Sequence, residues 1–282
     1  MTRSEGDRRV SRRAVLRASG GAVGLSAVGG ARAHEDGHDD EDDESSRCPE
    51  ATLLPSAHHC DGANMAGCAD DHPETVAFQE ACRDALEAEY PTVGTLIDRE
   101  FVPYFDTVLS GESNGYSHWL SPEFIGDDVT LDPERPESVL VDNASWQPIG
   151  VMFIATHEGE AFEPPPAVHG GDDPDEERCA PWHYHAGLPD RFAWWYYRQV
   201  YERDYEEGEF RLPCRTPCMM HVWTIPNPNG VYAHGPPPSD ERDEPPADGA
   251  GFETAAEPGE DELDWDVLPD EVVPDVLPGD LR

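Results

Sequence analysis

The sequence contains no lysine. All 19 of its basic residues are arginines, and they stand against 60 Asp and Glu, so the 282-residue chain carries a formal net charge of -41 at pH 7. A protein so poor in cations cannot neutralise a phosphate backbone, and we exclude nucleic acid as a partner. The chain also lacks the run of about 20 apolar residues that a membrane-spanning helix needs. We therefore expect no membrane span after removal of an N-terminal leader.

Residues 1–33 have the pattern of an export signal. Arg12 and Arg13 stand ahead of a short Gly/Ala/Val run, which ends in the small-x-small cleavage site Ala31-Arg32-Ala33. Twin arginines before such a run are typical of substrates of the twin-arginine translocation (Tat) pathway, which exports folded proteins. We predict a Tat signal peptide over 1–33 and a secreted or cell-surface location.

The charge of the mature chain predicts a halophilic protein. The leader holds seven of the arginines and only two acidic residues, so its removal takes the formal net charge to -46. Such repulsion raises the free energy of a compact state, and salt near 1 M removes most of it by shortening the screening length to about 3 Å. The combination of a twin-arginine leader, an excess of acidic residues and the absence of lysine resembles a haloarchaeal Tat substrate. Intrinsic disorder is the alternative, but seven tryptophans and runs such as "IGVMFIA" oppose it for the middle of the chain.

Composition divides the rest of the chain into three parts. Residues 34–47 have no apolar side chain and predict a disordered acidic arm, whereas 48–236 has the length and composition of one globular domain. Residues 237–282 form an acidic, proline-rich tail. We expect residues 236–262, where this tail begins, to be flexible. The remainder, "LDWDVLPDEVVPDVLPGDL", is either an extended segment that packs along the globular domain or an exposed apolar terminus.

The pattern of the globular part predicts an α+β fold, with N-terminal helices followed by a mostly antiparallel β-sheet in a single domain. Residues 71–90 predict a helix that Asp71 can cap, and 92–111 predict a second helix interrupted by Pro103. The runs "ESVLVD", "PIGVMFIAT", "RFAWWYYRQVY" and "CMMHVWTIP" then predict strands. The third of these runs has a helix ending at Gly208 as its alternative.

Seven cysteines predict disulfides, since exported proteins keep such bonds. The odd number leaves at least one cysteine unpaired within the chain. Four lie in the N-terminal part and three in the C-terminal part, which favours local pairing within each group. The alternative is a zinc site, because "CRTPCMMH" presents Cys214, Cys218 and His221 at a spacing that zinc accepts.

The motif "WHYH" is the principal candidate site. His183 and His185 stand two residues apart, so on a strand their side chains point to the same side, and the neighbouring aromatics would keep the imidazoles dry. We predict that they converge with His221, and further with His118, on a transition metal. Three neutral imidazoles and a water suit zinc, whereas a nearby sulfur suits copper. The alternative is that these histidines are scaffold residues. His234, which follows the tight turn "NPNG", is interpreted as a solvated loop residue.

Three segments together resemble a group of exported, functionally uncharacterised bacterial and archaeal proteins. The shared features are a Gly-x-x-His-aromatic stretch, an Asp-x-x-x-Pro-Glu-x-x-Leu strand, a Gly-Val strand and a His-x-Trp segment followed by Asn-Pro-x-Gly-x-aromatic. They fall here on Gly115, His118, Trp119, Asp132, Pro136, Glu137, Leu140, Gly150, Val151, His221, Trp223, Asn227, Pro228, Gly230 and Tyr232. The resemblance implies a shared fold, marks His118 and His221, and supplies no activity.

Three functions follow as hypotheses. The first is an exported, halophilic protein that binds zinc or copper through histidines. The second is a metal-dependent extracellular hydrolase or oxidoreductase, with Glu137, Asp190 or His157 as a base, although no known catalytic signature occurs. The third is a structural or interaction protein of the cell surface without a metal. The sequence identifies no specific partner.

Overall fold

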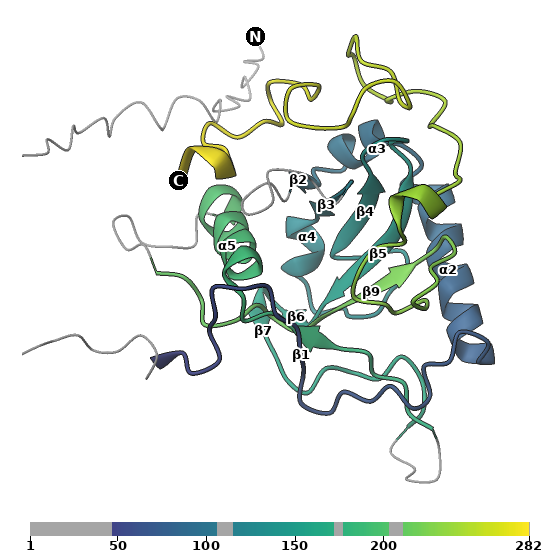
Figure 1. The fold of residues 1–282 in the computed structure, drawn as a ribbon, viewed down its shortest axis with the longest axis vertical. Helices are drawn as coiled ribbons and strands as arrows, with labels where there is room; N and C mark the ends of the chain where they lie inside the picture. Colours follow the sequence, from purple (N-terminus) through teal and green to yellow (C-terminus); the bar gives the residue numbers. More distant parts are fainter. Residues whose placement is uncertain (1–46, 106–114, 172–176, 203–210, 282) are drawn as a thin grey trace, which may run out of the picture. The chain divides into compact units, whose positions relative to one another are not determined.

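The computed structural model describes residues 47–105, 115–171, 177–202 and 211–281. The predicted signal peptide and nearly all of the acidic arm lie outside these ranges. The described part is an α+β domain built on a seven-stranded sheet in the order β1-β8-β9-β5-β4-β3-β2, with every neighbouring pair antiparallel (Figure 1). The predicted fold class is thus confirmed.

The sheet has long central strands and short edges. Its strands are β1 (His58–His59), β8 (His183–Tyr184), β9 (Met219–Trp223), β5 (Pro148–Ile154), β4 (Ser138–Asp142), β3 (Tyr116–Leu120) and β2 (Val102–Tyr104). A separate hairpin pairs β6 (Thr156–His157) with β7 (Glu160–Ala161). Three of the runs read as strands in the sequence are therefore strands, because their β-branched and apolar residues fill both faces of a covered sheet.

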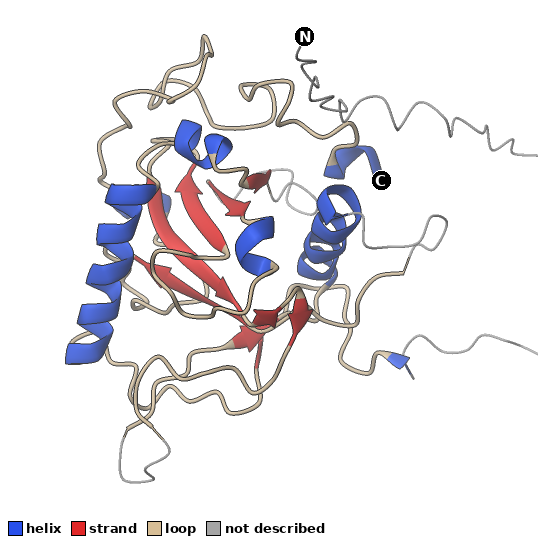
Figure 2. Cartoon of the chain, turned by 180° about the vertical axis from the view of Figure 1, so that it is seen from behind, coloured by secondary structure: helices blue, strands red, loops and turns tan. Residues whose placement is uncertain are grey.

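Helices cover the sheet from two sides, and Figure 2 shows the same arrangement from behind. Helix α2 (Pro73–Glu89) packs against β5 and β9, and α3 (Val93–Asp98) follows it. Helix α5 (Leu188–Tyr196) continues into a π-helical turn, η3 (Tyr197–Glu202), and α4 (Pro122–Ile125) is a single turn. The α5 side of the sheet has its own hydrophobic cluster, in which Phe192 and Trp195 of α5 join Met152 and Trp223 of the sheet.

The alternation of side chains along β9 decides which of its residues face α5. Met220 and Val222 belong to the larger core cluster, to which residues of α2 contribute, whereas Met219 and Trp223 belong to the cluster beneath α5. Since side chains alternate along a strand, His221 points to the α5 side with Met219 and Trp223. The sheet therefore presents a histidine among apolar side chains on this face.

One prediction of secondary structure is wrong, and one open alternative is decided. The run from Arg191 to Tyr201 takes the helical alternative rather than the strand, because Pro189 and Asp190 suit a first helical turn and Gly187 precedes it as the N-cap. The second predicted helix ends at Asp98, since Glu100 turns the chain away with a φ of 62°. Pro103 then lies on the edge strand β2, where its missing N–H breaks no sheet interior. Residues 106–111 and Gly208 lie outside the described ranges.

The first predicted helix is confirmed as α2, with a small difference at its start. His72, not Asp71, is the N-cap, and its Nδ1 accepts from the N–H of Glu74. The buried residues include Thr75 and Cys82, whereas Ala77 and Ala81 are exposed.

Six of the seven cysteines form disulfides, and Cys82 is the buried free thiol. The pairs are Cys48–Cys214, Cys60–Cys218 and Cys68–Cys179. The expected local pairing is wrong, since every bond joins the N-terminal segment to the C-terminal half. The reason lies in the sheet, where β1 forms the edge beside β8 and so brings residues 48–68 against chain more than 100 positions away. The bonds also leave Cys214 and Cys218 no thiolate for the alternative zinc site.

The tail is part of the folded body. The backbone N–H groups of Ala247, Gly259 and Leu263 donate to carbonyls of the 143–145 turn, and Gly94 donates to Ala250. Trp265 and Leu268 join the larger core cluster. The flexibility expected for residues 236–262 is therefore wrong. For the final segment, the alternative of an extended segment packed along the globular domain is confirmed. Its apolar residues stand apart between prolines and acids, so each packs at a separate position on the domain.

Candidate metal centre

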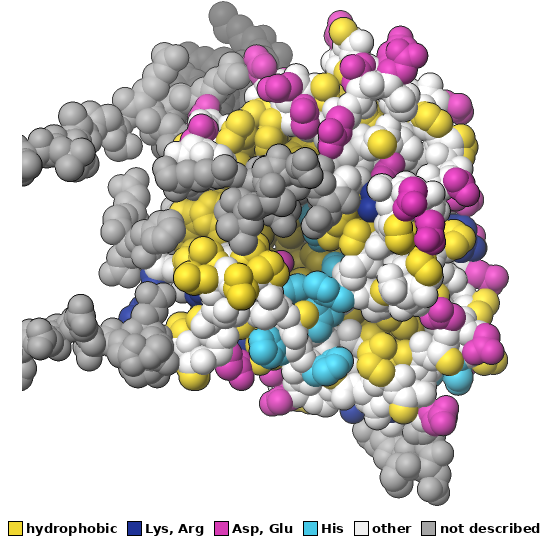
Figure 3. Space-filling model, viewed as in Figure 1, with side chains coloured by type: hydrophobic (Ala, Val, Ile, Leu, Met, Phe, Trp, Pro, Cys, Tyr) yellow, Lys and Arg dark blue, Asp and Glu magenta, His cyan; other side chains and the backbone are white. Residues whose placement is uncertain are grey.

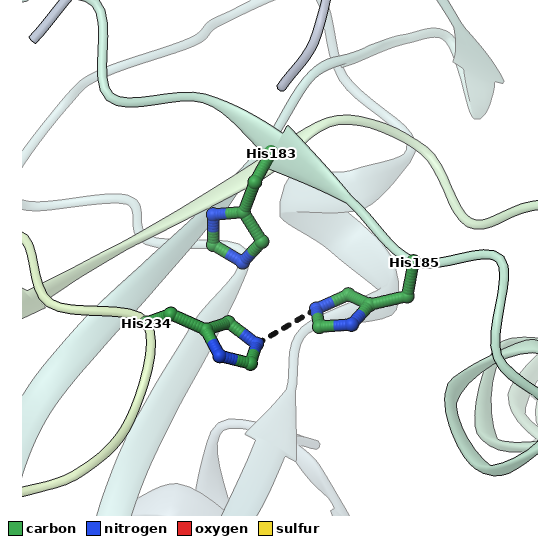
Figure 4. A group of neighbouring side chains, drawn as sticks. All are labelled: His183, His185 and His234. Carbon is green, nitrogen blue, oxygen red and sulfur yellow. Dashed lines mark hydrogen bonds between the residues drawn. The ribbon is translucent and has the colours of Figure 1, made fainter. Parts of the chain in front are cut away.

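Three histidines meet on the α5 side of the sheet, at its β8 edge. His183 and His185 project to one side of β8 and the residue after it, and His234 reaches them from the loop after β9 (Figure 4). Their rings are 5.1 Å apart for the first pair, and each lies 4.8 Å from the ring of His234. One ring nitrogen from each lies within 4.8 Å of the others, so the group could hold a metal ion.

The closest approach has the spacing of a metal site. The Nε2 atoms of His185 and His234 are 3.3 Å apart. Two nitrogens bound to one tetrahedral ion at about 2.0–2.1 Å would be separated by about 3.3 Å. Two neutral imidazoles at this distance either share one hydrogen bond or point their lone pairs at a common ion.

Backbone carbonyls orient His183 on β8 and His185 directly after it. His185 Nδ1 lies 3.0 Å from the carbonyl of Ser56 and 3.4 Å from the carboxylate of Asp190. A carbonyl only accepts, so Nδ1 carries the proton and Nε2 carries the lone pair. His183 has a backbone hydrogen bond to Pro181, which has no N–H to offer and so accepts it, and its buried Nε2 has no partner among the described residues. Metal-binding histidines typically have this outer support.

The contacts of Tyr184 and Thr216 fix the backbone around His183 and His185. Tyr184 points to the other side, where it joins the larger core cluster. The backbone of His185 is held on both sides by Thr216, whose hydroxyl accepts from its N–H and whose N–H donates to its carbonyl. Both imidazoles are buried, whereas His234 is exposed, so the site opens to solvent on the loop side. Figure 3 shows the histidine side chains together beside a hollow in this face.

Two further histidines form a layer on the sheet behind the group. His221 is 3% exposed, and its ring lies 5.6 Å from that of His183 and 6.1 Å from that of His234. His118 on β3 is half-buried, 6.0 Å from the ring of His221. The structure thus brings His183 and His185 together as the motif predicts, places His221 and His118 next to them, and puts His234 in the position that His221 was expected to occupy.

Four of these histidines, His118, His183, His221 and His234, have lowered pKa values, which favours the neutral form that binds metal. Burial, with a smaller contribution from the nearby imidazoles of His185 and His234, lowers the pKa of His183 to about 3. Burial likewise lowers the pKa of His118 to about 4, against an opposing effect of Asp190, and lowers that of His221 well below its usual range. The pKa of His234 is lowered by burial and by His185.

Of the three bases considered, Asp190 alone lies beside this group. Glu137 is buried directly before β4, where its Oε2 accepts from the N–H of Ile154 and burial raises its pKa to about 8. The charges that act on Glu137 are those of Asp127 and Arg135, with no histidine among them. His157 is exposed on β6.

Sequence reasoning missed His234 because a loop gives no periodicity. The residue lies in a loop, as interpreted, but the fold returns that loop to β8. The turn before it was the available signal, since Pro228 and Gly230 reverse the chain directly after β9, with Gly230 donating to Asn227 at a φ of 107°.

Comparisons with protein-family models, curated proteins and solved structures found no match for the chain. The geometry of the site therefore carries the functional argument. Three disulfides fit a protein that works outside the cell. Among the helices of the described ranges, none has the length and apolar content that crossing a bilayer requires.

Proposed function

We propose that this protein binds one transition-metal ion, zinc or copper, through His183, His185 and His234. The observation that carries the proposal is the convergence of three imidazole nitrogens within 4.8 Å, two of them on buried side chains whose other nitrogen is engaged by a backbone carbonyl. Imidazole suits both ions. Met219 lies opposite His183 in the β8–β9 pair, on the same face, and its thioether would favour copper.

Metal binding is tested on purified, chelator-treated protein in molar salt. Calorimetric titration with Zn²⁺ and with Cu²⁺, and elemental analysis after desalting, should find one ion per chain. Alanine at His183, His185 or His234 should weaken binding by more than the roughly 100-fold that loss of an outer hydrogen-bond partner costs. His157→Ala, at an exposed histidine of β6, is the matched control and should bind as the parent does. Equal binding by His234→Ala would refute the site.

We further propose that the mature protein is exported by the Tat pathway and works in high salt. The twin arginines and the cleavage pattern support the route, the disulfides support an oxidising destination, and the excess of acids supports the solvent. Lysine at both Arg12 and Arg13 should retain the precursor inside the cell, as immunoblots of cell and medium fractions would show. Undiminished secretion would count against the route.

A second candidate function is metal-dependent catalysis. His183, His185 and His234, which we call the metal group, would supply three protein ligands, and the group is exposed at His234. Zinc sites with three protein ligands and a water in the fourth position are typical of enzymes. Hydrolysis of activated esters by metal-loaded protein, absent from His185→Ala and retained by His157→Ala, would support this function. Equal activity of the metal-loaded and metal-free forms would contradict it.

A further inference from the structure

The loop that carries His234 is held by three side chains at consecutive carbonyls. Trp223 Nε1 donates to Ala233 at 2.8 Å, His221 Nδ1 to His234 at 2.8 Å, and Asn227 Nδ2 to Gly235 at 3.1 Å. We call these three side chains the carbonyl clamp. We propose that the clamp fixes His234 for metal binding, and that His221 is a positioning residue acting through Nδ1 rather than a metal ligand. The proposal rests on the metal function proposed above.

The role of His221 follows from its hydrogen bond and its distance. The carbonyl of His234 only accepts, so Nδ1 of neutral His221 carries the proton. The His221 ring lies 5.6 Å from the ring of His183 and 6.1 Å from that of His234, whereas the rings of His183, His185 and His234 are 4.8–5.1 Å apart. Imidazoles that share a tetrahedral ion have ring centres about 5 Å apart. His221 therefore stands one layer back, on the strand from which the loop departs.

Side chains of α2 also hold the loop where it leaves β9. Gln79 and Arg83 of α2 donate to the carbonyls of Trp223 and Thr224. In the middle of the loop, the carboxylate of Asp70 accepts from the N–H of Val231 at 2.9 Å. The clamp completes this set at the far end, next to the exposed imidazole. A metal ligand on a loop needs such support, because a productive site tolerates displacements of only about 0.5 Å.

The clamp gives a physical reason for the pattern His221-x-Trp223 followed by Asn227-Pro228-x-Gly230. Two residues of the strand and one of the turn reach the same short stretch of backbone, and Pro228 and Gly230 bend the chain so that this stretch returns to the strand. The pattern therefore fixes the position of the loop backbone at residues 233–235, and this backbone carries the imidazole of His234.

The decisive variant is His221→Asn, because an asparagine amide can donate from near the position of Nδ1 but has nothing at the position of Nε2. We expect it to bind one Zn²⁺ within about 3-fold of the parent affinity and to give the parent absorption spectrum when loaded with Co²⁺. His221→Ala should bind one ion 10–100-fold more weakly. If asparagine weakens binding as severely as His234→Ala does, His221 is a ligand and the proposal fails. Parent-like binding by His221→Ala would also overturn it.

Two further variants keep the test independent of folding at position 221. Asn227→Asp retains the acceptor for the N–H of Asn229 but loses the donor to Gly235, and Trp223→Phe keeps a ring but loses the indole N–H. Both should fold, by circular dichroism, and bind metal 10–100-fold more weakly. Parent-like affinity in both would contradict the clamp.

A separate measurement distinguishes failure of the proposed metal binding from failure of the carbonyl clamp. In metal-free parent protein, NMR of the imidazoles should detect a slowly exchanging Nδ1–H on His221, protected by its hydrogen bond. If that signal is present and no metal binds, the metal function fails while the clamp stands. If the signal is absent, the clamp fails whatever the metal result.

Discussion

Single carbonyl groups decide how the histidines of this protein face one another. The carbonyls of Ser56, Pro181 and His234 each engage one nitrogen of an imidazole, and the remaining nitrogen is then left with a lone pair. A buried lone pair without a donor is costly, so an ion or a water beside the unpartnered Nε2 of His183 would stabilise the fold. The chemistry of the site is thus set by backbone atoms from segments far apart in the chain.

This arrangement predicts how stability depends on pH. The folded pKa of His183 is about 3, whereas the unfolded chain takes up that proton near pH 6.5. Unfolding therefore binds a proton between these values, so the free energy of unfolding should fall as the pH is lowered from 6.5, by at most about 1.4 kcal/mol per pH unit from this residue. Denaturant titrations of metal-free His183→Asn in molar salt should show a shallower dependence between pH 6 and 4. His157→Asn is the control, and an unchanged slope in His183→Asn would be the contrary result.

The same residue-level comparison shows what the sequence could predict about the site. His183 and His185 are near neighbours on a strand, so their shared direction follows from period-two geometry alone. His221 and His118 lie on strands whose pairing could not be read, and the structure puts them in a second layer. His234 depends on a turn and on three side-chain hydrogen bonds, which no periodicity encodes.

Among the elements of the seven-stranded sheet, β1 and β8 are the shortest strands. Each has two residues, and they form the edge of the sheet that carries the pair of histidines. The bond between Cys60 and Cys218 joins the residue after β1 to the residue before β9. A covalent link thus fixes the short edge to the long central strand.

We therefore expect this disulfide to support both the fold and the metal group. The double variant Cys60→Ser with Cys218→Ser opens a link between residues 158 positions apart. Its free energy of unfolding should fall by about 2–5 kcal/mol, and metal should bind more weakly because β8 is less well held. Denaturant titration and calorimetry measure the two effects, with Cys82→Ser as a single-cysteine control. A variant as stable as the parent would argue against this role.

Elements were predicted well where one physical cause dominated. Helix α2 has a proline in its first turn and a tyrosine beyond its end, and β4, β5 and β9 are apolar runs with turns between them. The segment after α3 was wrong because a single positive-φ residue, Glu100, overrides its helical pattern. The aromatic run of α5 was ambiguous because tryptophan and tyrosine fit both a strand and a buried helix face.

At the scale of the whole molecule, the proline-rich tail shows why composition misleads. Acids and prolines dominate residues 236–262, yet Arg242 makes a buried ion pair with Asp142 at 2.7 Å and donates to the carbonyl of Gly115. Tyr196 of α5 donates to the carbonyl of Val276 near the other end of the tail. These contacts form only once the sheet exists, so they leave no local pattern in the sequence.

The charge of the whole molecule leads to the last prediction. The proposed removal of residues 1–33 would leave a formal net charge of -46 and no lysine to offset it, so the carboxylates would repel one another wherever salt does not screen them. Lowering the salt from 2 M to 0.05 M lengthens the screening distance from below about 3 Å to above 10 Å. The melting temperature should therefore fall steadily over this range. Scanning calorimetry of the mature protein in KCl measures the trend, and sucrose at matched viscosity is the control, since it adds no ions. A melting temperature that stays constant down to 0.05 M would show that the fold does not depend on screening and that halophily is the wrong interpretation of its acidity.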